Sequence, residues 1–334
     1  MRLIIPCLLF LLPLSLCAQL FPALGAQRAG ISSLTFLKME VSPRAAALAG
    51  ANVCLSGDAY SAYTNPATIA EVSSFSLAAA NTFWVSDINY AFLSAIVPTK
   101  FGNLGFSLSG LSSGPMKVRT VFQPEGTGEY FYANYLTAGL SYSQQLTDQF
   151  SYGVSAKYVY EGLAELSANT GVLDLGFLYR TDFKELRFAV MVQSFGVNST
   201  LKGTLEQRNV LAGRPLELES YPAPTVFKLG ISMVPFRNTT GDQVLTTLLQ
   251  LNRPNDNAEN IRLGVEYSYK SLLFLRAGYK INVKDQNYPT AGVGLRMRVG
   301  KHPLMFDYAF DPMKFLGNVH RIGLSFRMND GMRE

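Results

Sequence analysis

Cysteine is scarce in this 334-residue chain, which has three, at Cys7, Cys17 and Cys54. We expect the first two to be removed with a signal peptide, so that Cys54 stands alone in the mature chain. That arrangement excludes an intrachain disulfide and a cysteine-based metal site. An isolated cysteine of this kind is usually a small apolar residue of the interior, and we expect Cys54 to be buried.

Charge is also sparse. Charged residues make up 16% of the chain, whereas about 25% is usual in soluble domains. The formal net charge of +5 is small, and no basic cluster lies beside stacking aromatic residues, so we expect no nucleic-acid partner. After the N-terminus no apolar run approaches the roughly 18 residues that a transmembrane helix requires. A chain that is 48% hydrophobic without such a run is either a large soluble β-fold or a membrane β-barrel.

Catalytic motifs are missing as well. The two histidines, His302 and His320, lack a neighbouring pattern that would pair them with a nucleophile or a metal. We therefore predict a protein that is not an enzyme, with no catalytic residue, no metal site and no cofactor.

The N-terminus has the pattern of a signal peptide. Arg2 precedes an apolar stretch at 3–14, and Leu16-Cys17-Ala18 offers a cleavage site. A lipoprotein site is the alternative, but Leu16 is too large for the position before the modified cysteine. We expect residues 1–18 to be a signal peptide and the mature protein to be exported.

Most of the chain alternates with period two. Between Ile261 and Tyr269, for example, the odd-numbered residues are apolar and the even-numbered ones include Arg262 and Gly264. Such runs are about ten residues long, the length of a tilted membrane-spanning strand, whereas strands of soluble proteins are usually about five or six. One face is aliphatic and aromatic, and the other mixes glycine, serine and basic residues. This pattern favours a membrane barrel with a wet or loosely filled lumen over a soluble β-fold.

The runs number fourteen, an even number, as a bacterial barrel with both chain ends in the periplasm requires. The expected strands are 73–81, 89–97, 101–111, 131–145, 150–161, 170–180, 186–196, 225–235, 243–251, 261–269, 272–282, 289–299, 303–311 and 318–328. Short connections alternate with longer ones, of which 112–130 and 197–224 are the longest. The fold class is thus all-β, a transmembrane antiparallel barrel at 73–328 with a tail at 329–334. The long connections should face outside.

The segment 36–71 lacks this alternation, and we interpret the region 19–72 as a partly helical periplasmic or plug segment. Small helix formers at 45–49 and a possible turn at 58–63 are followed by a helix stop at Asn65-Pro66. The plug or gate candidates in it are Arg44, Asp58, Asn65 and Pro66. The first two could bond the plug to the wall, Asn65 could close a turn, and Pro66 would fix the backbone.

Basic residues outnumber acidic ones on the expected lumen face. They are Lys157, Arg180, Lys228, Arg262, Arg276, Lys280, Arg296, Arg298, Arg321 and Arg327, against Asp174, Glu266 and Asp307. Such a lumen could hold or pass anions. We favour the alternative that the charges pair across strands and with the plug.

The two long loops carry apolar residues. The candidates for partner binding are Val121, Phe122, Leu205, Val210, Leu211, Leu216, Leu218 and Tyr221. On a surface loop they would mark contact with another protein. The alternative is that they fold inward as a lid over the barrel mouth.

Several motifs resemble the PorV/PorQ family, FadL-like outer-membrane barrels of the type IX secretion system in Bacteroidota. They include Phe36-Leu37-Lys38, Ser42-Pro43-Arg44-Ala45-Ala46, Ala49-Gly50-Ala51, Asp58-Ala59, Thr64-Asn65-Pro66-Ala67, Gly126-Thr127-Gly128-Glu129, Leu140-Ser141-Tyr142, Leu146-Thr147-Asp148, Val172-Leu173-Asp174-Leu175-Gly176, Leu178-Tyr179-Arg180, Asp307-Tyr308-Ala309-Phe310 and His320-Arg321-Ile322. The set extends over nearly the whole mature chain. The stretch 47–49 stands where the family usually has a glycine-rich stretch, and 67–70 stands where it commonly has A-G-L-A.

The resemblance implies a fourteen-stranded outer-membrane barrel with a plug, surrounded by outer-membrane lipid. It also implies a non-enzymatic role in secretion, with translocon or attachment-complex proteins and cargo carrying a C-terminal signal domain as partners. The competing hypothesis is a transporter of hydrophobic small molecules, as FadL relatives are. A basic, glycine-rich lumen argues against the transporter.

Overall fold

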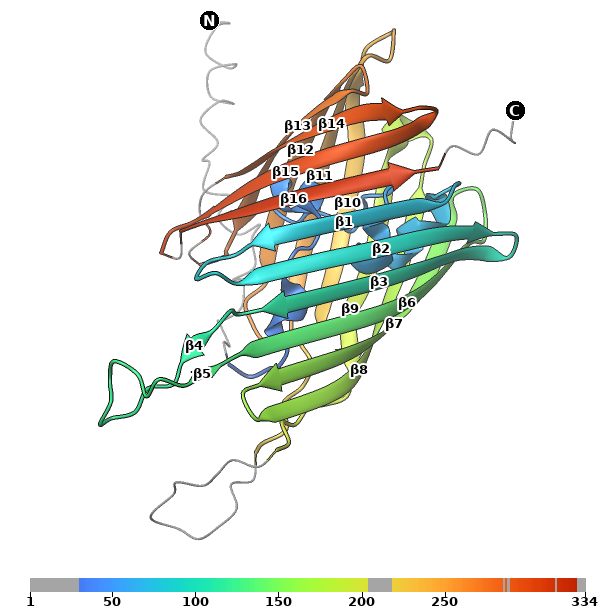
Figure 1. Cartoon of the computed structure of the whole chain (residues 1–334). Coiled ribbons are helices and arrows are strands. Elements are labelled where there is room, and N and C mark those ends of the chain that lie inside the picture. The colour runs from blue at the N-terminus through green and yellow to red at the C-terminus, as the bar shows by residue number, and fades with distance from the viewer. Residues whose placement is uncertain (1–29, 204–217, 285, 287–288, 316, 329–334) are drawn as a thin grey trace, which may run out of the picture.

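The computed structural model describes residues 30–203, 218–284, 286, 289–315 and 317–328. Within these residues fourteen strands close into one antiparallel barrel (Figure 1). The predicted all-β fold and strand number are therefore confirmed. The expected signal peptide and C-terminal tail lie outside the described residues. No helix of the described part is long and apolar enough to cross a membrane.

The barrel strands are β1 (Ser76–Phe83), β2 (Asn89–Thr99), β3 (Gly102–Ser112), β6 (Ala133–Gln145), β7 (Phe150–Leu163), β8 (Leu166–Arg180), β9 (Arg187–Gly196), β10 (Val226–Arg237), β11 (Gln243–Pro254), β12 (Asn260–Tyr269), β13 (Leu273–Ile281), β14 (Thr290–Val299), β15 (His302–Met313) and β16 (Gly317–Arg327). A short 3-10 turn, η5 (Phe183–Glu185), precedes β9. Each strand pairs with its neighbours along the chain, and β1 pairs with β16 from Ser76↔Arg327 to Phe83↔His320. This β1–β16 pair is the seam of the barrel.

One predicted strand is divided. The run expected at 131–145 breaks at Tyr132, and β5 (Tyr130–Phe131) pairs with β4 (Met116–Lys117) instead of with the barrel. The two form a ribbon that extends beyond the barrel end, where Figure 1 also places the described parts of the connection between β9 and β10, residues 197–203 and 218–225. We call this the loop end and the opposite one the short-turn end.

The outward face of the barrel is apolar. On β12 and β13 the side chains of Leu263, Val265, Leu275 and Tyr279 alternate with buried inward residues and are each 40% or more exposed. An apolar surface that continues around many strands is unfavourable in water and matches the lipid-facing band of membrane barrels.

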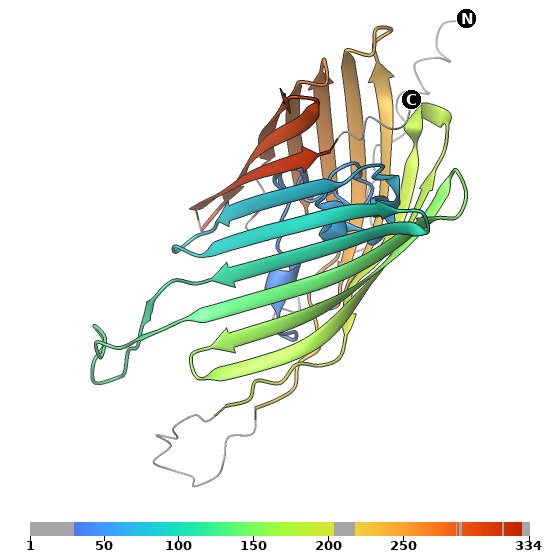
Figure 2. The ribbon, with the colours of Figure 1, turned by 45° about the vertical axis from the view of Figure 1, so that its right-hand side comes forward.

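Residues 30–75, the described segment before β1, lie inside the barrel (Figures 1 and 2). It contains η3 (Thr35–Lys38), α2 (Pro43–Ala47), α3 (Ser61–Thr64) and η4 (Pro66–Glu71), and we call residues 30–75 the plug. Ser42 caps α2, accepting a hydrogen bond from the Ala45 amide. Pro66 ends α3 as expected, but it also opens η4, because proline suits the first position of a helix.

Inward-facing glycines allow the plug backbone to approach the wall closely. A Cβ at Gly153 on β7 would lie 2.3 Å from the carbonyl carbon of Pro66, and one at Gly278 on β13 would lie 2.4 Å from the Ala49 nitrogen. A Cβ at Gly176 on β8 would lie 2.1 Å from the side-chain oxygen of Asn65. The interpretation of these glycines as a sign of a loosely filled lumen is wrong, because the plug occupies the space that they leave.

Candidate functional site

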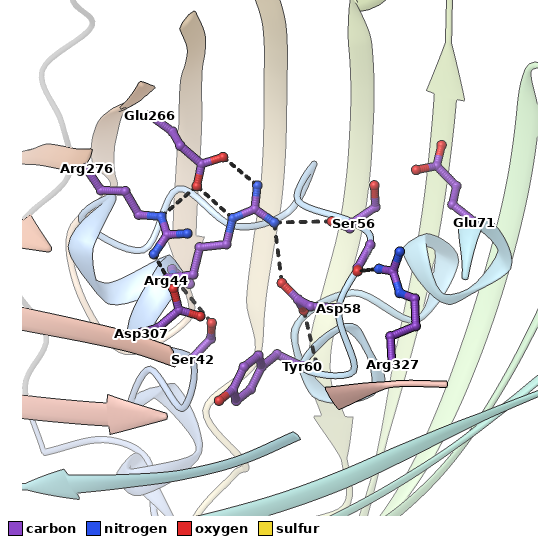
Figure 3. Close-up of polar contacts among 12 residues, drawn as sticks. Ser42, Arg44, Ser56, Asp58, Tyr60, Glu71, Glu266, Arg276, Asp307 and Arg327 are labelled. Atoms are coloured by element: carbon purple, nitrogen blue, oxygen red, sulfur yellow. Dashed lines mark hydrogen bonds and ion pairs between the residues drawn. The ribbon is translucent and has the colours of Figure 1, made fainter. Parts of the chain in front are cut away.

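Arg44 connects the plug to the barrel wall (Figure 3). Its Nε and Nη2 donate to the two carboxylate oxygens of Glu266 on β12 at 2.9 and 2.7 Å. Arg276 on β13 donates to Glu266 at 2.6 Å and also binds Asp307 on β15. The carboxylates of Glu266 and Asp307 therefore bind the guanidinium groups of Arg44 and Arg276. These contacts bond α2 directly to β12 and, through Arg276, to β13 and β15.

Asp58, the second residue expected to bond plug to wall, bonds within the plug instead. Its Oδ2 lies 3.4 Å from Arg44 Nη1, and its Oδ1 accepts the Tyr60 amide at 3.1 Å. Burial raises the pKa of the Asp58 carboxyl, and the attraction of Arg44 opposes that shift without cancelling it. Asp58 thus contributes to the fold of the plug and reaches Glu266 only through Arg44.

Asn65 and Pro66 fix the turn between α3 and η4. The Asn65 side chain donates to the Val53 carbonyl at 2.6 Å and accepts from the Ala67 amide at 3.1 Å. Asn65 is fully buried. The turn closes as the sequence indicates, and it lies against Gly153 and Gly176 of the wall.

A threonine that the sequence analysis did not single out holds the end of α2. Thr290 Oγ1 on β14 donates to the Ala47 carbonyl at 2.8 Å and accepts from the Ala49 amide at 3.1 Å. Ala49 itself has a left-handed backbone, with φ of 58°, which is unfavourable for a residue with a Cβ. The wall therefore stabilises an irregular helix end.

Tyr60 bonds the plug to the barrel seam. Its hydroxyl donates to the Ala79 carbonyl on β1 at 3.0 Å and lies 3.4 Å from the Leu324 carbonyl on β16. Ala79 and Leu324 are paired across the seam. The plug is thus anchored where the first and last strands meet.

Two cavities lie on opposite sides of α2. The larger, of about 290 Å³, is bordered by Ala46 and by residues at the loop end of the barrel, among them Trp84 and Pro254. The smaller, of about 150 Å³, is bordered by Arg44 and by residues near the short-turn end, including Ser76 and Arg327. The plug therefore lies between the two cavities, with Ala46 of α2 bordering one and Arg44 of α2 bordering the other.

The loop-end cavity is strongly basic. Its lining includes Lys38, Lys228, Arg262, Lys280 and Arg321, together with the acidic Glu40 and Asp311. Lys38 pairs with Asp256 at 2.6 Å, and Lys280 pairs with Asp311 at 2.9 Å. The expectation that lumen charges pair is met by these residues and by Lys157–Asp174. Among the described residues no carboxylate lies within ion-pair distance of Lys228 or Arg262.

The loop residues expected to bind a partner have different environments. Val121 and Phe122, between β4 and β5, are each 94% exposed. Tyr221 is partly exposed, and its carbonyl accepts from Ser33 of the plug, while Leu218 is half-buried. Leu205, Val210, Leu211 and Leu216 lie outside the described residues.

The chemistry of the lumen is that of binding and positioning. No group of three or more histidine, cysteine, aspartate or glutamate side chains in the described part is arranged to hold a metal ion. Sequence reasoning missed Glu40, Trp84 and Thr290, because their roles depend on contacts across the lumen. The basic bias of the inward face was the signal that pointed to the cavity.

Comparisons with known proteins identify the architecture. No protein-family model matches the sequence, and no curated protein sequence matches it. Among solved structures, the chain resembles the Pseudomonas putida toluene transporter TodX with a TM-score of 0.58 and 13% identity, covering 87% of this chain and 99% of that one.

It also resembles the Ralstonia pickettii toluene transporter TbuX, with a TM-score of 0.57 and 13% identity over 86% of this chain and 98% of that one. A third is the CymD monoaromatic hydrocarbon channel, with a TM-score of 0.55 and 13% identity over 88% and 97%. At this identity the likeness shows that the chain shares its barrel fold with these proteins.

Proposed function

We propose that this protein is an outer-membrane channel that admits a small solute through a lumen gated by the plug. The observation that carries this proposal is the position of α2 between a cavity at the loop end and a cavity at the short-turn end. A solute that enters the first cavity would reach the second once α2 moves. The similar structures, which are named as transporters and a channel, agree with a transport role.

The contacts that hold α2 in place are consistent with a role for this helix as a gate. The α2 helix is held by polar contacts, with Glu266 through Arg44 and with Thr290 through the helix end. Its apolar neighbours there are small, because Ala46 and Ala47 form a cluster with Ala309 alone. Polar contacts of this kind can exchange for solvent when the helix moves, whereas separating a large apolar interface costs about 25 cal/mol per Å².

A flux assay tests the proposal. The purified barrel would be reconstituted into liposomes, and the entry of small uncharged, anionic and aromatic solutes would be compared with entry through the Glu266→Gln variant. We expect slow, selective entry in the wild type and faster entry in the variant, because a neutral amide at this position would bind Arg44 less tightly than the carboxylate does. Equal entry into protein-free liposomes and into those with either protein would contradict a channel.

Type IX secretion is the second candidate function, and exposed residues of the β4–β5 ribbon favour it. Val121 and Phe122 project into solvent beyond the barrel, where a translocon protein or the C-terminal signal domain of cargo could bind them. The PorV/PorQ resemblance supports the same role. The solute channel and the interaction surface occupy different parts of the molecule.

Affinity capture from gently solubilised outer membranes tests this second role. The Val121→Ser/Phe122→Ser variant should lose secretion partners that the wild type retains. Phe101, 83% exposed in the turn between β2 and β3 at the opposite end, provides the matched control as Phe101→Ser. Recovery of the same partners by all three proteins would exclude the ribbon as their binding site.

A further inference from the structure

Four basic side chains surround the loop-end cavity at its wall. They are Lys228 on β10, Arg262 on β12, Lys280 on β13 and Arg321 on β16, and we call them the basic ring. Lys228 and Arg321 are only 7% and 2% exposed. Side chains of four barrel strands thus bring four cations to one cavity.

The strand register places two of these cations side by side. Arg262 and Lys280 are direct partners in the β12–β13 pair. Like charges directly opposite each other on one face destabilise a sheet. Asp311 binds Lys280 on its other side, at 2.9 Å, and lies 3.5 Å from Arg321. Within the described part of the chain, no carboxylate lies within ion-pair distance of Arg262, and Glu40 and Asp311 attract its guanidinium from further away.

The remaining partners of the ring are neutral. Lys228 Nζ lies 3.5 Å from the Asn52 side-chain oxygen, and Arg262 donates to the Asn260 side chain at 3.1 Å and the Gly50 carbonyl at 3.3 Å. Glu40, the other carboxylate of the cavity, accepts a hydrogen bond from Asn52 at 2.7 Å and makes no ion pair with the ring among the described residues.

Arg321 has a donor without an acceptor. Its Nε is buried and has no hydrogen-bond partner among the described residues, while its guanidinium carbon lies 5.6 Å from the centre of the Trp84 ring. With four cations against Glu40 and Asp311, the described lining of the ring region has an excess of two positive charges. Buried charge of one sign is unfavourable unless an opposite charge compensates it.

We propose that the loop-end cavity binds a small dissolved organic anion through its carboxylate or phosphate oxygens. Lys228, Arg262 and the free Nε of Arg321 would donate to those oxygens, and Trp84 and Tyr63 would contact the rest of the solute. The volume of about 290 Å³ lies at the lower end of the range for ligand pockets, about 300–1,000 Å³. The cavity therefore suits a compact solute better than a long chain.

The inference deepens the proposed function by naming the class of solute, and it rests on that function only for the idea that the bound anion is transported. The hydrocarbons for which the similar structures are named carry no charge, so the basic ring predicts a different selectivity for this barrel.

Intrinsic tryptophan fluorescence can report binding in this cavity. Trp84 is the single tryptophan of the sequence and lines the cavity. Purified protein in detergent would be titrated with succinate, with inorganic phosphate, with chloride at equal ionic strength and with an uncharged sugar alcohol, while tryptophan emission is recorded. We expect a saturable change with one or both oxyanions, and none with chloride or the sugar alcohol.

Variants locate the site. Lys228→Gln and Arg262→Gln should each weaken oxyanion binding by about ten- to a hundredfold, the loss expected for one hydrogen bond to a charged group. Arg296→Gln removes a cation from the short-turn cavity, on the other side of α2, and should leave binding unchanged. Heat-modifiable migration on gels would confirm that each variant is folded.

Three outcomes would overturn the inference: no saturable change with either oxyanion, an equal response to chloride, or unchanged affinity in both ring variants. The experiments distinguish failure of the anion-binding inference from failure of the channel proposal. Oxyanion binding without flux into liposomes would remove the transport role and leave the site, whereas flux of neutral solutes without oxyanion binding would retain the channel and remove the site.

Discussion

Arg44 and Glu266, 222 residues apart in the sequence, form a two-pronged ion pair across the lumen, with nitrogen–oxygen distances of 2.9 and 2.7 Å. Glu266 is almost fully buried and Arg44 is mostly so. An interaction of this geometry fixes both the distance and the orientation of α2 relative to β12.

Arg44→Met should loosen the plug. Removing one partner of a buried pair costs about 3 kcal/mol or more, because the other charge is left poorly compensated. We expect a lower thermal unfolding midpoint in detergent and greater sensitivity of cells to large antibiotics. Arg237→Gln breaks the half-exposed Arg237–Glu185 pair and is the control, since exposed pairs contribute about 0–1 kcal/mol. Equal effects of both substitutions would show that the Arg44 contact has no special role.

Gly176→Ala should displace the plug without opening the barrel. The new Cβ would lie 2.1 Å from the Asn65 side-chain oxygen, and overpacking of this kind costs about 1–3 kcal/mol. Gly171→Ala lies on the outward face of the same strand with no atom within 4 Å, and should be neutral. The rate at which a thiol reagent modifies the buried Cys54 measures the displacement, and it should rise in the first variant alone.

Asp58 should make stability depend on pH. Its pKa is raised above the usual value of 3.8 by burial, so the folded protein retains a proton that the unfolded chain releases. The stability that this group contributes is therefore present below pH 3.8 and is lost as pH rises through the raised pKa. Asp58→Asn keeps the acceptor for the Tyr60 amide, and its thermal midpoint should exceed that of the wild type increasingly as pH rises above 3.8. A difference between the two midpoints that does not change with pH would contradict the shift.

Labelling of introduced cysteines tests which end of the barrel faces the outside of the cell. Glu125→Cys, in the exposed tip between β4 and β5, should react with an impermeant reagent on whole cells, whereas Lys270→Cys, between β12 and β13, should not. Background from Cys54 should be low, because burial raises the pKa of its thiol to about 12 and keeps it protonated. Reaction at 270 with silence at 125 would reverse the topology.

The strands could be predicted because lipid imposes the same requirement on every one of them. An outward residue must be apolar at each second position, so the period of Ile261–Tyr269 is visible without any tertiary information. The division at Tyr132 could not be seen, because both halves have strand-forming residues and only their partners differ.

The candidate site was predictable in part. Arg44, Asp58 and Asn65 were identified from their place in the one stretch without alternation, but the partner of Arg44 depends on a contact across the lumen. The basic ring was visible as an excess of charge, whereas the adjacency of Arg262 and Lys280 requires the strand register. The glycines were misinterpreted because a small residue looks the same beside water and beside a closely packed backbone.

The bond of Tyr60 to both edges of the seam has a consequence for biogenesis. The plug precedes β1 in the chain, so it is synthesised before any strand of the barrel, whereas β16 is synthesised after the other barrel strands. The carbonyls that Tyr60 contacts come together only when β16 pairs with β1. We therefore expect insertion intermediates to remain open-sided and unplugged until the final strand arrives, when a single event completes the cylinder and encloses its own N-terminal segment.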